Sequence, residues 1–318
     1  MALNWTIIGT GVIAKEMANA FNNNHRDIYA VFSRHSDNAL AFADNYGITK
    51  KFNTLAAVFS DSNVDAVYIA TPHNTHFNIA KQALMSGKHV LMEKSITTNK
   101  HDLDQLKQIA NENNLLLMEA MTLVHMPLMK KLKSAINDGL LGQVKIINVT
   151  FGSHKPYDAQ NRFFNPTLGG GALLDIGVYA VAGARYFMSS QPQNVHSFVN
   201  YAPTGVDEQS VTILNNIQNE MATISLSLQA KQPKALTVSG TKGYFRILEF
   251  PRAQEAIWYH TETGQTELIE SGHTEDALFY EISDFELVLE NPKKYTMYET
   301  VTSDVFSIFE NMKQQWDA

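Results

Sequence analysis

The first 120 residues alternate between short apolar runs and segments with helical spacing, and this alternation constrains the fold more than any other feature. Apolar runs of strand length lie at 5–9, 28–33, 65–70, 89–92 and 115–118. Segments with helical spacing separate them, at 12–21, 36–47, 75–87 and 99–114. Strands that alternate with helices of about a dozen residues form right-handed βαβ units. We therefore predict an α/β domain with a doubly wound parallel sheet over residues 1–120.

The pattern changes after residue 120. Helical spacing recurs at 127–138 and 169–188, and a long strand pattern lies between them at 143–153. From about 193 to 270 strand follows strand with no helix between, which favours antiparallel pairing. Two helices finish the chain, and one face of the last carries Val301, Val305, Ile308, Phe309, Met312 and Trp316, so it packs. No low-complexity linker divides the halves, and we predict an α+β domain with a large, mostly antiparallel sheet over 121–318.

The composition limits the classes of protein to which the chain can belong. Hydrophobic residues make up 44% and charged residues 18% of the 318 residues, an ordinary globular balance. The net charge of -7 disfavours non-specific binding to nucleic acid or an anionic membrane, and the absence of cysteine excludes disulfides and thiol chemistry. No signal-peptide pattern opens the chain, and the longest weakly polar segment, 170–188, contains Asp175 and Arg185. We expect a cytoplasmic protein with no nucleic-acid or membrane partner.

The first predicted strand runs into 9-GTGVIAKEM-17, a G-x-G-x-x-A pattern. Gly9 permits a tight turn, Gly11 lacks a side chain that would keep a pyrophosphate from the backbone, and Ala14 lets the helix approach the strand. The helix N-terminus offers free N–H groups and positive dipole density to phosphates. The pattern also occurs in purely structural turns, but here it opens the first βαβ unit, the context that dinucleotide binding requires. We assign cofactor contacts to Gly9, Thr10, Gly11, Val12 and Ile13.

The end of the second predicted strand selects between the two nicotinamide dinucleotides. An NAD site usually has a carboxylate there for the ribose hydroxyls, but 30-AVFSRHS-36 has no acidic residue at its tip. Ser33 can donate a hydrogen bond to a 2′-phosphate, and Arg34 can pair with that phosphate and stack on adenine. The alternative is that Arg34 is only a surface residue at a turn. We predict a preference for NADP, with NAD possible.

Polar residues also follow the strand predicted at 65–70, at the sheet edge where ligands bind in folds of this class. We assign Thr71, Pro72, Asn74 and His76 to the cofactor. His73 and His76 could instead suggest a metal site, but neither an HExxH pattern nor a third nearby ligand accompanies them. No metal is predicted.

Two glutamates, Glu93 and Glu119, follow later predicted strands. Either could contact the nicotinamide ribose, and either could instead form a salt bridge between elements. We carry both as candidate cofactor residues.

Together these motifs resemble the glucose–fructose oxidoreductase / inositol dehydrogenase / MocA family over essentially the whole chain. The resemblance rests on GTGVIA (9–14), SR with AFADNYG (33–34 and 41–47), DAVYIATPHNTH (65–76), GKHVLMEK (87–94), MEAM with HMP (118–127) and LGGGALLDIGVY (168–179). The MEA…HMP segment and the tyrosine that ends LDIGVY look most like the branch of dimeric dihydrodiol dehydrogenase and NADP-linked xylose dehydrogenase.

The resemblance implies a Rossmann domain, a substrate domain with an open-faced antiparallel sheet, and an active site in the cleft between them. It implies hydride transfer between a nicotinamide and a hydroxyl or carbonyl carbon, usually of a sugar or polyol, or of a cyclic diol in the branch named. The lysine of the family's EKP motif falls on Lys94, which would also contact the cofactor. The family's acid/base position in the second domain falls on Tyr179, and the aspartate of the same motif falls on Asp175. Ser95 replaces the family's proline after the lysine, which removes a fixed backbone angle and predicts a slightly looser loop.

The chemistry of these residue types fits such roles. Oxidation of an alcohol needs its hydroxyl proton removed, and a tyrosinate takes that proton only if its pKa falls from about 10 toward working pH. A nearby ammonium group, such as that of Lys94, lowers a tyrosine pKa. If 169–188 is helical, Asp175 and Tyr179 share a face, and Asp175 could orient a substrate hydroxyl or hold Lys94.

We also expect Arg162 to line the substrate site, together with Asp175 and Tyr179. The glycines at 169–171 could cradle a phosphate, but no GK[ST] follows them, so a turn with close backbone approach is preferred.

Two other functions stay open on the sequence. Some relatives in this family bind the dinucleotide and regulate partners without catalysis, although retention of both Lys94 and Tyr179 argues against that role. A metal-dependent hydrolase would use His73 and His76. We expect a homodimer or homotetramer, because an open sheet leaves a broad face to cover.

Overall fold

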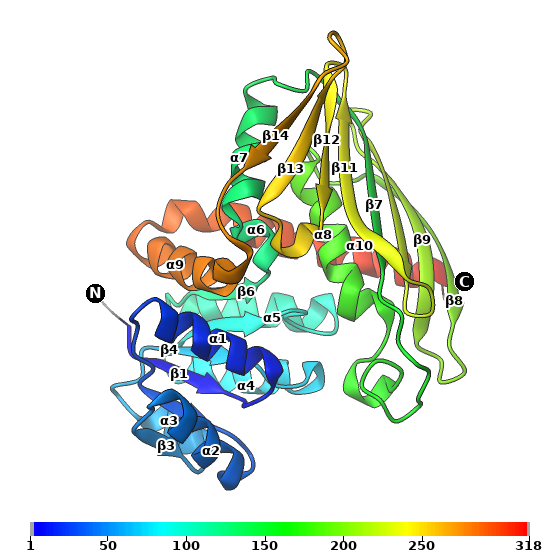
Figure 1. Cartoon of the computed structure of the whole chain (residues 1–318). Coiled ribbons are helices and arrows are strands. Elements are labelled where there is room, and N and C mark those ends of the chain that lie inside the picture. The colour runs from blue at the N-terminus through cyan, green and yellow to red at the C-terminus, as the bar shows by residue number, and fades with distance from the viewer. Residues whose placement is uncertain (1–2, 317–318) are drawn as a thin grey trace. The chain divides into compact units, whose positions relative to one another are not determined.

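The computed structural model describes residues 3–316, and the chain divides into two compact units. Figure 1 shows their helices and strands along the chain. The first unit combines Met1–Ala120 with Leu278–Tyr298, and the second combines Met121–Ala277 with Glu299–Ala318. The sequence predicts one domain over the whole of 121–318, whereas the segment at 278–298 belongs to the first unit.

The first unit is built, within the described residues, on a six-stranded parallel sheet with the order β3-β2-β1-β4-β5-β6. Its strands are β1 (Trp5–Ile8), β2 (Ala30–Phe32), β3 (Lys50–Phe52), β4 (Ala66–Ile69), β5 (His89–Glu93) and β6 (Leu117–Ala120). The connecting helices are α1 (Val12–Asn23), α2 (Ser36–Tyr46), α3 (Leu55–Ser60), α4 (His73–Met85) and α5 (Lys100–Glu112). Every residue of β1 and β4 is buried, as expected for central strands of a parallel sheet. The strand order reverses between β1 and β4, and ligands bind at such switch points.

Three details of this unit differ from the prediction. The pattern does not predict β3 or α3, because an edge strand of three residues with only Phe52 buried shows no periodicity. Helix α3 instead depends on a local cap, in which the Thr54 hydroxyl accepts from the Ala57 amide at 3.1 Å. Strand β6 begins two residues later than predicted, because Asn114 has a positive φ of 55° and the Leu115 amide still donates to Ala110 in α5.

Helix α9 (Ala277–Glu290) brings a late part of the chain to the first unit. The rings of Phe285 and Trp5 lie 5.0 Å apart, and Glu286 accepts two hydrogen bonds from Arg26 at 3.1 and 2.7 Å. The Tyr295 hydroxyl donates to the Leu117 carbonyl at 2.6 Å. These partners are far apart in the chain, which is why local patterns do not reveal the return.

The second unit contains an eight-stranded sheet with the order β14-β13-β12-β11-β7-β10-β9-β8 (green to orange in Figure 1). Its strands are β7 (Val144–Gly152), β8 (Asn194–Tyr201), β9 (Asp207–Asn215), β10 (Met221–Ser227), β11 (Gln232–Gly240), β12 (Gly243–Leu248), β13 (Glu255–His260) and β14 (Thr266–Glu270). Strands β7 and β10 pair in parallel, and the other neighbouring pairs in the described sheet are antiparallel. The predicted α/β and α+β classes are therefore confirmed.

Helices accompany this sheet. They are α6 (Thr122–His125), α7 (Pro127–Asn137), α8 (Val178–Phe187) and the part of α10 (Tyr295–Trp316) that follows Tyr298, with short turns at Pro166–Leu168, Phe250–Arg252 and Thr274–Asp276. The short turn at Pro292–Lys294 and the first residues of α10 belong to the first unit. Helix α8 packs against β7, β10 and β11. The stretch Pro166–Phe187 has the length and mean hydropathy (1.3) of a membrane span, but 67% of its most apolar window is buried in the structure, as in a core helix. On α10, five of the six predicted apolar residues are buried and Trp316 is half-buried, which confirms that this helix packs.

Candidate functional site

A cavity of about 420 Å³ lies in the first unit, where the loops after β1, β2 and β4 meet α4. Eight of the predicted cofactor residues line it: Gly9, Thr10, Gly11, Ser33, Arg34, Thr71, Pro72 and Asn74. The others, Val12, Ile13, His76, Glu93, Lys94 and Glu119, lie outside this lining. The cavity therefore sits at the switch point of the sheet, the position at which a doubly wound fold binds a dinucleotide.

The two glycines of the first loop meet different surroundings. Gly9 has a positive φ of 113°, and a Cβ there would lie 2.4 Å from the Ala70 carbonyl oxygen, so only glycine fits. A Cβ on Gly11 would meet no described atom within 4 Å. Helix α1 begins at the next residue, and no described side chain caps its N-terminus. Open space in front of uncapped N–H groups fits a pyrophosphate.

The loop after β2 gives the cavity its charge. Arg34 and His35 line it beside Ser33, and the described lining contains no aspartate or glutamate. The Thr10 hydroxyl donates to the Ser33 hydroxyl at 3.4 Å, which joins this loop to the glycine loop. A lining with an arginine and no carboxylate fits a ligand that carries a 2′-phosphate.

His76 is not among the residues that line the cavity, and its ring contacts two backbone carbonyls instead. Its side chain is fully buried, and its two ring nitrogens lie 3.0 Å from the Ser95 carbonyl oxygen and 2.8 Å from that of Thr71. Burial lowers the pKa of His76, and the carbonyls of Thr71, Ser95 and Ile96 oppose that shift only in part. The ring therefore links the loop after β4 to the loop after β5.

The two histidines of the metal-site alternative contact backbone carbonyls. His73 Nε2 lies 3.0 Å from the Lys94 carbonyl oxygen, so each of the two histidines faces backbone carbonyls. Within residues 3–316, no group of three or more histidine, aspartate or glutamate side chains could hold a metal ion.

Buried polar groups hold the segment around Lys94. Glu93 is buried and accepts a hydrogen bond from the Tyr68 hydroxyl, and its carboxylate also accepts from the Lys94 amide at 3.3 Å. Glu119 lies within β6 and accepts from the Ile96 amide at 2.9 Å. Ser95 is fully buried, and the Lys94–Ser95 peptide bond is cis. These contacts restrain the loop on both sides of Lys94. The prediction of a looser loop considered only the replacement of proline by Ser95 and did not include these contacts.

In the second unit, Arg162 and Asp175 lie together. Arg162 Nη2 is 3.6 Å from Asp175 Oδ1, and the guanidinium also stacks 4.3 Å from the centre of the Phe163 ring. The Asp175 side chain is 14% exposed and that of Arg162 60% exposed, so a small molecule can reach the pair from the arginine side.

Tyr179 is half-buried in the first turn of α8. Its hydroxyl oxygen lies 3.5 Å from the Thr122 hydroxyl, which itself donates to the Pro251 carbonyl at 2.7 Å. The Thr122 hydroxyl is the donor in both of these contacts. Lys94 belongs to the first unit and Tyr179 to the second.

The predicted helix over 169–188 is a composite. It contains a π-helical turn, η2 (Leu173–Gly177), followed by α8, and Asp175 lies in the π-helical part. Such turns are frequent at functional sites. The amides of Gly170 and Gly171 donate to the carbonyls of Asn165 and Phe163 at 3.0 and 2.9 Å. The glycines therefore form the predicted close-approach turn, with these amides already engaged.

Sequence reasoning missed Asp207. It begins β9, and its Oδ2 accepts a hydrogen bond from the Leu173 amide, the first residue of η2, at 2.6 Å. In the sequence it is an aspartate after a turn, two residues past Gly205, and nothing local marks it.

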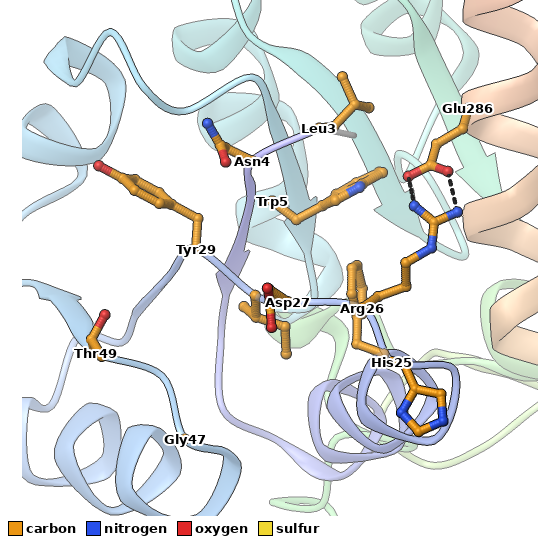
Figure 2. Close-up of a pocket in the computed structure, with 12 residues that line it drawn as sticks. Leu3, Asn4, Trp5, His25, Arg26, Asp27, Tyr29, Gly47, Thr49 and Glu286 are labelled. Atoms are coloured by element: carbon orange, nitrogen blue, oxygen red, sulfur yellow. Dashed lines mark hydrogen bonds and ion pairs between the residues drawn. The ribbon is translucent and has the colours of Figure 1, made fainter. Parts of the chain in front are cut away.

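A second cavity, of about 510 Å³, lies at the opposite, amino edge of the parallel sheet (Figure 2). Figure 2 shows Trp5, Arg26, Asp27 and Glu286 around it, with Arg26 paired to Glu286. Its arginine is already engaged by a carboxylate, and the second carboxylate, Asp27, would repel a phosphate. Helix α1 ends on this side, at Asn23, and presents carbonyl groups there. Although this cavity is the larger, its chemistry does not suit a dinucleotide.

Two family models match the chain. The model described as "Oxidoreductase family, NAD-binding Rossmann fold" matches residues 3–121. The model described as "GFO/IDH/MocA C-terminal domain" matches residues 129–246.

Known proteins resemble the chain over most of its length. The trans-1,2-dihydrobenzene-1,2-diol dehydrogenase of Xenopus laevis is 31% identical over 255 residues, which span 79% of this chain and 76% of that protein. A levoglucosan dehydrogenase solved with NADH and levoglucosan superposes with a TM-score of 0.88 at 17% identity, over 98% of this chain and 96% of the other. A 3-ketoreductase from Actinomadura kijaniata solved with NADP has a TM-score of 0.85 at 21% identity, over 99% and 98% of the two chains. At these identities the two structures show a shared fold.

Proposed function

This chain belongs to the GFO/IDH/MocA family of oxidoreductases, and we propose that it transfers a hydride between NADP and a hydroxyl or carbonyl carbon of a sugar, polyol or cyclic diol. The observation that carries this proposal is the cavity at the switch point, which Gly9 shapes and which Gly11 leaves open. The curated relative named above acts, by its name, on a trans-dihydrodiol, and the solved neighbours include sugar enzymes.

The residues of the cavity support NADP over NAD. The neighbours include proteins solved with NADH and with NADP, so the family alone does not select. Arg34 supplies a permanent charge for the 2′-phosphate, and the absence of a carboxylate from the described lining removes repulsion. Ser33 adds a hydroxyl donor at the same position.

We predict that Arg34→Asp reverses this preference. The substituted carboxylate repels the 2′-phosphate and accepts from ribose hydroxyls, so kcat/KM for NADP should fall by roughly 10- to 100-fold relative to NAD. The measurement is the ratio of kcat/KM values for the two cofactors. Asp37→Asn changes a charge in the first turn of α2 outside the cavity lining and serves as the control. Equal kcat/KM values for NADP and NAD in the unmodified protein would contradict the proposed preference for NADP.

Proton transfer is assigned to Lys94 and Tyr179. When bound, the nicotinamide gives or takes the hydride, and the protein must hold and move the proton of the reacting oxygen. The Lys94 amide donates to the Glu93 carboxylate and the Lys94 carbonyl lies 3.0 Å from His73 Nε2, so the backbone of Lys94 is held in place, and we assign its ammonium group to that oxygen. Tyr179 is assigned as a second proton-transfer group for the reacting oxygen, and Asp175, paired with Arg162, is assigned to orient a further substrate hydroxyl.

A substrate screen tests the function. The protein is mixed with NADP or NAD and with trans-1,2-dihydrobenzene-1,2-diol, levoglucosan or xylose, and absorbance of the reduced nicotinamide is followed. We expect reduction of NADP with at least one of these substrates. Tight NADP binding with no turnover of this panel in either direction would favour a cofactor-sensing regulatory protein instead.

We also propose that the chain forms a homodimer or homotetramer through the uncovered face of its eight-stranded sheet. Phe198, which is 80% exposed, pairs in register with exposed Val211, and Met221 pairs with exposed Ile146. An apolar face spread over several strands is typical of an interface between copies.

A further inference from the structure

We propose that Asp207 is a positioning residue for the substrate site: its carboxylate fixes the first turn of the helix that carries Asp175 and Tyr179. This inference rests on the proposed function, because it concerns residues to which that function assigns roles. Asp207 itself is not placed against substrate or cofactor.

Helix η2 starts without a cap of its own. The residue before it, Ala172, makes no side-chain capping bond, so the N–H groups of the first turn need a partner from elsewhere. Asp207 supplies it from another element, since its Oδ2 accepts from the Leu173 amide at 2.6 Å. A carboxylate at this end of a helix is also favoured by the helix dipole.

The same carboxylate fixes the turn that leads into the helix. Gly171 has a positive φ of 119°, and a Cβ on it would lie 2.1 Å from Asp207 Oδ1. Gly171 is therefore required for the carboxylate to come this close. The Gly171 carbonyl in turn accepts from the Asp175 amide at 3.3 Å, so the turn that packs against the Asp207 carboxylate also holds the backbone of Asp175.

The strand beneath Asp207 is well anchored. Strand β9 pairs along its length with β8 and β10, and the Glu208 carbonyl accepts from the Leu228 amide at 2.9 Å. Asp207 thus connects a rigid sheet to the start of a π-helical turn. Misplacement by about 1 Å at a reacting group can cost about 100-fold in rate, so such a connection matters for Asp175 and Tyr179.

The charge of Asp207 changes near neutral pH. Burial raises the pKa of Asp207 to about 7, against the amides of Leu173 and Ala172, its own amide and the ammonium group of Lys313 on α10, which all favour the carboxylate. The pKa of Asp207 is thus higher in the folded protein than the ordinary value of 3.8, so the folded state binds more protons between these two values. The contribution of Asp207 to the free energy of unfolding therefore falls as pH rises from about 4 to about 7. Replacement by asparagine removes that dependence while it keeps an oxygen for the Leu173 amide.

The test compares Asp207→Ala, Asp207→Asn and the neighbouring control Glu208→Gln. Amide hydrogen exchange is measured for the peptide covering 170–180, NADP binding by fluorescence titration, and kcat and KM with a substrate that the unmodified protein turns over. We expect Asp207→Ala to speed exchange in this peptide and to lower kcat at least about tenfold, with the Kd for NADP within about twofold. Asp207→Asn should restore slow exchange and most of kcat.

The pH dependence supplies a second, independent readout. The melting temperature of Asp207→Asn minus that of the unmodified protein should grow between about pH 4 and pH 7 and then level off. Glu208→Gln should leave exchange and kcat as they are. Unchanged exchange and kcat in Asp207→Ala, equal impairment of the alanine and asparagine variants, or a joint loss of NADP binding and kcat would overturn the positioning role. If no substrate is turned over, the proposed function fails. Amide hydrogen exchange and the melting temperatures then still test whether Asp207 stabilises the start of the helix.

Discussion

Gly9 and Gly11 lie two residues apart in one loop, but they are required for different reasons. At Gly9 the constraint is internal, because the Ala70 carbonyl approaches and φ is positive. At Gly11 the described protein leaves the space in front of the residue empty. The first glycine is thus required by the fold, and we propose that the second leaves room for the pyrophosphate.

Alanine substitutions should separate the two roles. We predict that Gly9→Ala lowers the free energy of unfolding by about 1–3 kcal/mol, because it puts a side chain where backbone already lies. Gly11→Ala should leave stability within about 0.5 kcal/mol and raise the Kd for NADP about tenfold. Denaturant unfolding and fluorescence titration of both variants measure these effects. If Gly11→Ala binds NADP as tightly as the unmodified protein, the cavity does not hold the pyrophosphate at this residue.

Single residues were predictable where the requirement is local. The glycine loop, Arg34 and the loop after β4 could be placed at one edge of the sheet because each directly follows its own strand, and all three line the cavity. The hydrogen bonds of His76, Glu119 and Asp207 could not be predicted, because their partners Ser95, Ile96 and Leu173 come from other elements.

At the level of elements, the edge strand β8 is protected by the last helix. The Gln315 side chain accepts from the Ser197 amide at 3.1 Å and donates to the Val195 carbonyl at 2.7 Å. The Trp316 indole donates to the Ser197 hydroxyl at 2.9 Å. An unprotected edge is a template for pairing with another chain, so these bonds act against aggregation.

We predict that Gln315→Ala lowers the free energy of unfolding by about 1 kcal/mol and speeds aggregation on heating. The matched control is Gln314→Ala, whose exposed side chain is next in sequence. Denaturant unfolding and light scattering give the two quantities. The protective role is ruled out if both glutamine variants scatter light equally at the same temperature.

Elements with strong periodicity were predicted, and short or composite ones were not. Strands β1 and β4 are continuous buried runs, whereas β3 has a single buried residue. The π-helical turn at Leu173–Gly177 has the same apolar spacing as an α-helix, so periodicity cannot distinguish it.

At the level of the whole molecule, one face of the second sheet carries exposed apolar side chains, among them Phe198 and Val211, that a single chain leaves in contact with solvent. If copies associate through it, a charge placed on Phe198 would be buried without a partner, which is costly. We predict that Phe198→Glu shifts the protein toward monomer in light scattering coupled to size-exclusion chromatography. Leu40→Glu, at an exposed apolar residue of α2, should not. A wholly monomeric unmodified protein would contradict the proposed assembly.

The role of Lys94 decides between an enzyme and a cofactor sensor, and a single-turnover experiment measures it most directly. The unmodified protein, Lys94→Ala and the surface control Lys100→Ala are saturated with NADP, mixed with a substrate found in the screen, and followed by absorbance of the reduced nicotinamide. We predict that Lys94→Ala binds NADP normally but reduces it at least about 100-fold more slowly, while Lys100→Ala matches the unmodified protein. Reduction by Lys94→Ala at the unmodified rate would contradict the account.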